Sequence, residues 1–154
     1  MPMEASGLAG LVLADHATGD LVSPACYRDF LLPVHREIIA ALGAPTILRI
    51  CGNTANRLEY IASAGFDAFH FDSKVDPATA LPLVDGEMTL IGNVNNPGTL
   101  LLGDPDEVRR EVRSILSAGI RIVGPECALP LSTPSANLAA IPRAVEEYCQ
   151  TSEE

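Results

Sequence analysis

The chain has 154 residues, 47% of them hydrophobic and 19% charged, which suits a single globular domain over residues 1–154 with a buried core. Its formal net charge of -10 and its 10 Lys and Arg residues argue against nucleic acid as a partner, because a phosphate backbone binds clustered basic side chains. No apolar stretch reaches the roughly 18 residues of a membrane helix, and the N-terminus lacks the pattern of a secretory signal. We therefore expect a soluble, cytoplasmic protein with no membrane partner.

The first elements in chain order are a predicted strand, a loop and a helix. The apolar run Leu8–Ala14 is typical of a strand that is buried on both faces. Ser23 and Pro24 resemble the N-cap and the first position of a helix that ends near Gly43, and Pro33 should kink or shorten it. The apolar stripe of this helix is expected at Tyr27, Phe30, Leu31, Val34, Ile38 and Leu42.

The same alternation continues through the rest of the chain. Further strands are predicted at 45–50, 66–71, 87–92 and 120–124, and helices at 55–65, 76–83, 104–119 and 135–148. Residues 93–103 are expected to form a loop with a short apolar turn. Strands that alternate with helices pair in parallel, which leaves an open doubly wound sheet or part of a barrel.

Polar or sulfur-bearing side chains follow nearly every predicted strand, and no strand is followed by GxGxxG or a phosphate-binding lysine loop. The carboxyl ends of parallel strands meet on one face, where the active sites of (β/α)8 barrels are built. The pattern favours an α/β fold of the (β/α)8 TIM barrel type, represented by about five units. We expect one common edge to hold Asp15, Cys51, Asp72, Asn93 and Cys127.

The four cysteines fall into two groups. Cys26 and Cys149 lie in predicted helices, whereas Cys51 and Cys127 follow predicted strands. Their wide spacing is unlike a secreted disulfide framework, so free thiols are expected. Two thiolates from neighbouring strand ends are suitable soft ligands for zinc, which can hold and activate a substrate thiolate. The alternative is that each cysteine is a small buried hydrophobe.

The three histidines have different expected roles. His16 follows the first strand and could be a metal ligand or a proton-transfer group, because its ordinary pKa lies near neutrality. His35 is expected on a helix surface, and His70 is expected to be partly buried and hydrogen-bonded within a strand.

Several oxygen-bearing residues complete the set of candidates. Asp15 and Asp72 could orient a ligand or bind a cationic group, although acidic residues at strand ends also cap helices. Glu126 could supply an oxygen ligand to a metal or point to solvent. Asn53 and Asn93 lie in turns after predicted strands and are candidate cofactor-binding residues.

Segments that span about 7 to 148 resemble the uroporphyrinogen decarboxylase superfamily, and its zinc-dependent methylcobamide methyltransferases most closely. They follow the family's order and cover about the C-terminal half of its barrel. The segments are DHATGDLVSPACYRDFLLPVHREI (15–38), ILRICGNT (47–54), FDSKVD (71–76), LIGNVNNPGTLLLGDPDEV (90–108) and GPECALPLSTPSANLAAI (124–141).

The resemblance implies an activity and partners. Such enzymes transfer a methyl group from a methylcobamide to a thiol such as coenzyme M, or to tetrahydrofolate in related members. The implied partners are a small-molecule methyl acceptor and a corrinoid or corrinoid protein.

The resemblance also implies a zinc site in which a His-x-Cys motif and a distant cysteine bind the metal. Cys51 and Cys127 match the two cysteines, but Arg49 occupies the histidine position. Arginine has no lone pair to donate and cannot be a ligand. Either Glu126 or His16 completes an altered site, or this chain does not bind metal in that way.

The small number of strand–helix units and the presence of basic residues leave other assembly states and other functions open. Five units are fewer than the eight of a full barrel, so we expect open sheet edges and either self-association or a complementary N-terminal half. A metal-free decarboxylase acting on tetrapyrrole carboxylates is one alternative function, with Arg49 and Lys74 as its basic residues. A non-catalytic binding or assembly subunit is the other.

Overall fold

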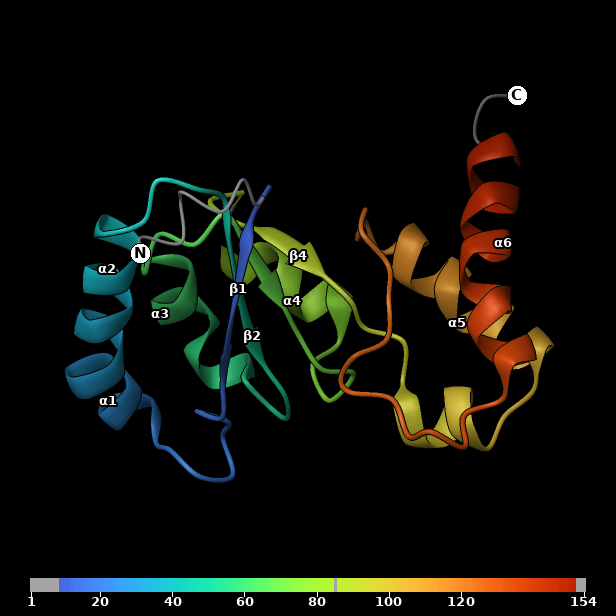
Figure 1. Cartoon of the computed structure of the whole chain (residues 1–154), viewed down its shortest axis with the longest axis horizontal. Helices are drawn as coiled ribbons and strands as arrows, with labels where there is room; N and C mark the ends of the chain where they lie inside the picture. The colour runs from blue at the N-terminus through green and yellow to red at the C-terminus, as the bar shows by residue number, and fades with distance from the viewer. Residues whose placement is uncertain (1–8, 85, 152–154) are drawn as a thin grey trace.

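The computed structural model describes residues 9–84 and 86–151 of the chain. Four short strands form one parallel sheet in the order β1-β2-β3-β4, so each strand pairs with the next one along the chain. Figure 1 shows this sheet with helices packed beside it. Leu8, the first residue of the first predicted strand, lies outside the described residues. The strands are β1 Leu11–Asp15, β2 Thr46–Ile50, β3 Ala68–His70 and β4 Thr89–Ile91.

The first helical region is continuous but changes type twice. It consists of α1 (Pro24–Cys26), the π-helical turn η2 (Tyr27–Leu31) and α2 (Leu32–Ala40). The N–H of Leu32 donates to the carbonyl of Tyr27, five residues earlier. Pro33 follows directly and cannot donate such a bond. The helix therefore passes the proline through a widened turn and continues to Ala40.

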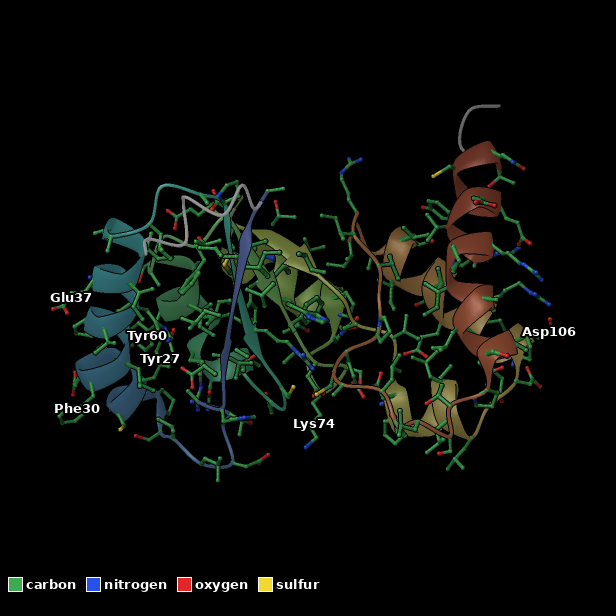
Figure 2. All side chains as sticks on the ribbon, in the orientation of Figure 1. Tyr27, Phe30, Glu37, Tyr60, Lys74 and Asp106 are labelled. Atoms are coloured by element: carbon green, nitrogen blue, oxygen red, sulfur yellow. The ribbon has the colours of Figure 1, made fainter. Side chains whose placement is uncertain are left out.

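The π turn moves the buried face of this helix. In a π turn the backbone N–H donates to the carbonyl five residues earlier, so the turn contains one residue more than an α turn. Buried positions after Tyr27 therefore fall at Leu32 and His35, whereas Phe30 and Val34 are largely exposed. Figure 2 shows Phe30 on the outer side of the helix and Tyr27 on the side toward the sheet. The predicted apolar stripe was wrong at Phe30 and Val34 for this reason.

The main core lies between the sheet and the helices that follow the strands. These helices are the short η3 (Ala55–Arg57), α3 (Leu58–Ala62) and α4 (Pro77–Val84). Side chains alternate between the two faces of a strand. On β2, Leu48 and Ile50 are fully buried against the helices, whereas Arg49 lies on the opposite face of the sheet and is half-buried.

The second half of the chain pairs two long helices. The predicted loop instead contains a π-helical segment, η4 (Asn96–Leu101), which Asn95 caps by accepting from the Gly98 N–H at 2.6 Å. Next come α5 (Pro105–Ser117) and α6 (Ser135–Thr151), which pack against each other. Figure 1 shows this helix pair beyond β4.

The predicted fifth strand, 120–124, was wrong as a strand. The segment follows β4 in parallel through two isolated bridges, Ile91 with Ile122 and Val94 with Pro125. The backbone hydrogen bonds that join it to the chain after β4 run from Gly92 N–H to the Ile122 carbonyl, from Val94 N–H to the Gly124 carbonyl and from Glu126 N–H to the Val94 carbonyl. Two separate bridges therefore stand in place of a continuous ladder. Ile122 is 49% exposed. The segment still carries Glu126 and Cys127 to the carboxyl ends of the strands.

Within the described ranges, no helix has both the length and the hydropathy needed to cross a bilayer.

Candidate functional site at the carboxyl ends of the strands

One arginine contacts two cysteines that are distant in the sequence. Arg49 and Cys51 lie two residues apart, on the same face of the chain as it leaves β2. The Nη2 of Arg49 is 3.1 Å from the Sγ of Cys127 and 3.8 Å from the Sγ of Cys51. The structure therefore brings the two strand-end cysteines together, with a guanidinium group in contact with both.

The two thiols differ in acidity. Burial raises the pKa of Cys51 to about 11, and its hydrogen bond with Cys127 acts in the same direction. Burial also opposes ionisation of Cys127, but hydrogen bonds involving Cys51, the backbone of Ala128 and Arg49 outweigh it and lower the pKa of that thiol. A guanidinium beside a thiol favours the charged form. Of the two thiols, Cys127 is therefore the more acidic.

Asp72 joins three of the loops that follow the strands. Its Oδ2 accepts from the Gly52 N–H at 2.7 Å, and its Oδ1 accepts from the Lys74 N–H at 3.0 Å. The Nδ2 of Asn93 donates to the carbonyl of Asp72 at 3.2 Å and to that of Val75 at 3.0 Å. Both predicted site residues are buried. They form a fixed polar layer beneath the loops.

Glu126 is buried and both of its oxygens accept hydrogen bonds. Oε2 accepts from the Ser73 N–H at 2.8 Å, and Oε1 accepts from the Asn96 N–H at 2.8 Å and from Asn95 Nδ2 at 3.4 Å. The carboxylate thus connects the loop after β3 to the start of η4. It does not point to solvent, and the sequence pattern gave no sign of these partners.

Asp15 belongs to a buried hydrogen-bonded chain. The Nε2 of His35 lies 3.0 Å from Asp15 Oδ2, and the hydroxyl of Tyr27 lies 2.9 Å from His35 Nδ1. The hydrogen bond from His35 lowers the pKa of Asp15, although burial acts against this. The expectation that His35 lies on the helix surface was wrong, because the π turn carries it to the inner face. There its ring also meets Phe66 edge-on, with centroids 5.5 Å apart.

Arg57 is a buried cation that the sequence analysis missed. Its Nη1 donates to the Ala17 carbonyl at 2.7 Å, and its Nη2 donates to the Val22 carbonyl at 2.5 Å. Its Nε donates to Asn56 Oδ1 at 3.2 Å. Burial lowers the pKa of this guanidinium. Arg57 holds the loop after β1 against η3, and one arginine at a helix start carries no sequence signal for such a role.

His70 faces the same side of the sheet as Arg49, its partner in the β2–β3 register. Its Nε2 lies 2.7 Å from the Pro125 carbonyl, so Nε2 carries the proton in this bond. Burial lowers the pKa of His70, and the positive charge of Arg49 adds to this. The expectation of a partly buried, hydrogen-bonded histidine is confirmed.

Three further candidate residues are exposed at the rim. His16 is exposed beyond the end of β1. Asn53 accepts from the Ala55 N–H at 3.1 Å through its Oδ1, which shapes its own turn. Lys74 points away from the sheet (Figure 2) and lies 3.7 Å from Asp20, a contact between the loops after β3 and β1.

The residues at this edge do not fit a zinc ion. A zinc site needs three or four donor groups from the protein, and no three His, Cys, Asp or Glu side chains gather suitably anywhere in residues 9–84 and 86–151. Glu126 is committed to three N–H donors, and His16 is exposed. A guanidinium lies against the two sulfurs instead.

A parallel sheet of consecutive strand–helix units, with polar and thiol side chains at its carboxyl edge, defines the chain as part of a (β/α)8-type barrel. Its sequence matches the family described as Uroporphyrinogen decarboxylase (URO-D) over residues 4–148, and the chain belongs to this family. The family and the partial barrel expected from the sequence are both confirmed.

Two relatives are methyltransferases of Methanosarcina species. The chain is 35% identical over 138 residues to a methylated-thiol–coenzyme M methyltransferase of Methanosarcina mazei, covering 89% of this chain and 37% of that protein. It is 32% identical over 148 residues to the methylcobamide:CoM methyltransferase MtaA of Methanosarcina barkeri, covering 95% and 44%. A uroporphyrinogen decarboxylase of Gloeobacter violaceus is 32% identical over 116 residues, or 72% of this chain. The chain thus spans less than half the length of these relatives.

Solved structures show the same architecture. A methyltransferase from Methanosarcina mazei has a TM-score of 0.91 at 30% identity, over 96% of this chain and 44% of its own. An archaeal fructose-1,6-bisphosphate aldolase reaches a TM-score of 0.59 at 15% identity, which supports the fold alone.

Proposed function

We propose that this chain provides part of the barrel of a corrinoid-dependent methyltransferase, which moves a methyl group from a methylcobamide to a thiol or to tetrahydrofolate. The observation that carries the proposal is its likeness to the coenzyme M methyltransferases. The match to MtaA covers 95% of the chain, against 72% for the decarboxylase of Gloeobacter violaceus. The similarity extends through the loops that hold the strand-end residues.

The residues of this chain support the transfer through charge and position. Methyl transfer to a thiol forms a sulfur–carbon bond as the cobalt–carbon bond breaks, and the electron pair of that bond stays on the cobalt. The attacking sulfur must be a thiolate. In our proposal the guanidinium of Arg49 favours a thiolate at the mouth, and the ionised Asp15 orients a ligand there. Asp72, Asn93 and Glu126 keep the loops in place.

Methyl transfer can be measured directly. We would incubate the chain with methylcobalamin and either coenzyme M or tetrahydrofolate, and then detect the methylated product by mass spectrometry. Because this chain spans 44% of MtaA, the assay would be run twice, once with the chain alone and once with a separately produced segment of MtaA from outside the matched region. We expect product formation to depend on the chain and to fall in Arg49→Gln. Absence of product in both arrangements would contradict the proposal.

A metal-free decarboxylase is a second candidate. The family assignment and the zinc misfit favour it, together with two basic residues, Arg49 near the sulfurs and Lys74 at the rim. Acidic substituents of a tetrapyrrole would pair with such cations. Incubation with uroporphyrinogen and detection of carbon dioxide separate this activity from methyl transfer.

A binding or assembly subunit is a third candidate, and the open edges of the sheet favour it. Within the described residues β1 pairs with β2 alone, and Val12, on the same face of the sheet as Arg49, is 62% exposed. An open strand edge offers unpaired N–H and C=O groups to another chain. We expect association with a second copy or with a complementary barrel half, weakened by Val12→Lys. A strictly monomeric mass at micromolar concentration, with no binding to the MtaA segment, would exclude it.

A further inference from the structure

We propose that Arg49 is the built-in cation of the strand-end site, that it takes the place of a metal ion between Cys51 and Cys127, and that it alone separates this site from a zinc site. The inference does not depend on any activity of the chain. It rests on the positions, the partners and the charges of the residues around the two sulfurs.

Position is the first argument. A cation that binds two sulfurs at once has to lie between them. The Nη2 of Arg49 lies there, 3.1 Å from the Sγ of Cys127 and 3.8 Å from the Sγ of Cys51. A zinc ion would need to approach each sulfur to about 2.3 Å in the same region. The guanidinium therefore occupies the space through which both sulfurs would coordinate a common metal.

The partners of the neighbouring side chains are the second argument. The protonated Nε2 of His70 faces the Pro125 carbonyl. The carboxylates of Asp72 and Glu126 each accept backbone N–H groups with both oxygens. His70 keeps a lone pair on Nδ1, but no third His, Cys, Asp or Glu side chain gathers with the two sulfurs among residues 9–84 and 86–151. Two sulfurs fall short of the three protein ligands of an open zinc site.

Charge is the third argument. A guanidinium stays protonated and has no lone pair, so it repels a divalent cation and cannot coordinate it. In place of metal coordination, the guanidinium donates hydrogen bonds to the sulfurs and its positive charge compensates the negative charge of a thiolate. The Nε of Arg49 is buried and has no hydrogen-bond partner among the described residues. The contacts of Nη2 with the two sulfurs are what hold this side chain in the site.

One substitution should therefore create the missing ligand. Positions 49 and 51 lie on the same face of the chain, so a ring nitrogen at position 49 would face the two sulfurs. Two cysteines and one histidine, with the fourth position open to water or a thiol, are a known zinc ligand set. Arg49→His supplies this set without another change.

The test compares metal content among purified, folded variants. Each protein is incubated with zinc, separated from free metal in the presence of a weak chelator, and analysed by mass spectrometry of the metal. We expect the native chain to retain almost no zinc and Arg49→His to retain about one zinc per chain. Cobalt in place of zinc should give thiolate-to-metal absorption in Arg49→His only. Zinc should also protect Cys51 and Cys127 from alkylation in that variant and not in the native chain.

Controls separate the effect of position 49 from the effect of an added histidine. Arg36→His places the same substitution on the exposed face of α2, where the arginine donates to the Ser63 carbonyl, and should gain no zinc. Arg49→Ala removes the cation without adding a ligand and should also remain metal-poor. Adding Cys51→Ser to Arg49→His should remove the gained zinc. If Arg49→His fails to fold, Arg49→Cys supplies a third ligand of another kind.

Two results would overturn the inference. One is a native chain that retains about one zinc, lost in Cys51→Ser or in Cys127→Ser. The other is a folded Arg49→His or Arg49→Cys protein that binds no more zinc than the native chain.

Discussion

The imidazole of His35 hydrogen-bonds to the carboxylate of Asp15 across 3.0 Å, and this bond connects the middle of α2 to the last residue of β1. The hydroxyl of Tyr27 completes the chain on the other side of the ring. A neutral imidazole can accept from Tyr27 at Nδ1 and donate to Asp15 from Nε2. The interaction keeps a candidate site residue ionised at neutral pH.

Asp15→Asn should reduce stability in a pH-dependent way. The pKa of Asp15 in the folded protein lies below its ordinary value of 3.8 because of the hydrogen bond from His35. The carboxylate therefore contributes stability above about pH 4, and this contribution is lost as the pH falls through the folded pKa. We expect a loss of about 1–2 kcal/mol at neutral pH. Urea unfolding of both proteins across this range measures it.

Asp20→Asn is the matched control, because Asp20 lies in the same loop and its side chain is 67% exposed. Its effect should be small at every pH. A difference between native and Asp15→Asn protein that stays constant down to acid pH would contradict the role of the ionised carboxylate.

Tyr27→Phe should destabilise the protein although it removes a single oxygen. The substitution leaves His35 Nδ1 buried without its hydroxyl partner, and an unsatisfied buried polar atom costs about 1–3 kcal/mol. Thermal or urea unfolding gives the value. Tyr60→Phe, which removes a hydroxyl from a half-buried ring on α3, should cost less. Equal effects of the two substitutions would argue against a special role of the Tyr27–His35 bond.

Arg57→Lys should loosen the loop after β1. One guanidinium donates to the carbonyls of Ala17 and Val22 at once, and an ammonium group cannot reproduce this planar pair of contacts. We expect a loss of about 2–3 kcal/mol and faster hydrogen exchange in residues 16–22. Hydrogen-exchange mass spectrometry resolves the loop. Arg110→Lys on the exposed side of α5 is the control and should leave exchange unchanged.

Alkylation should distinguish the two thiols at the strand ends. The pKa of Cys51 is about 11, whereas that of Cys127 is lowered, so Cys127 contains far more thiolate at mildly alkaline pH. We expect iodoacetamide to modify Cys127 at least about tenfold faster than Cys51. Peptide mass spectrometry follows each site separately from the exposed Cys26 and Cys149. Arg49→Gln should slow the reaction at Cys127, and an unchanged rate would contradict the effect of the guanidinium.

The sequence was sufficient for the parts of the fold that depend on local patterns. Apolar runs identified β1 to β4 within a few residues. The helix predicted at 104–119 is present as α5, with Asp104 at its N-cap. The meeting of Cys51 and Cys127 also followed from the rule that parallel strands end on one face.

The remaining features depend on contacts that no local pattern encodes. The π turn before Pro33 changes which residues of the helix are buried, and so His35 was placed on the wrong face. The segment 120–124 has the composition of a strand, but it is joined to its neighbour only through two isolated bridges. Arg57 was not singled out because its acceptors, the carbonyls of the loop after β1, are distant in the sequence.

The consecutive order of the four strands has a consequence for how such a protein can be divided. Every sheet contact is between neighbours in the chain, so a unit can be added beside β1 or removed there without changing any other pair. In a sheet where spatial neighbours are far apart in the sequence, dividing the chain would separate paired strands and leave unpaired strands in the middle of the sheet. The arrangement makes the barrel modular. It explains how a chain spanning 44% of a related methyltransferase keeps the same architecture at a TM-score of 0.91.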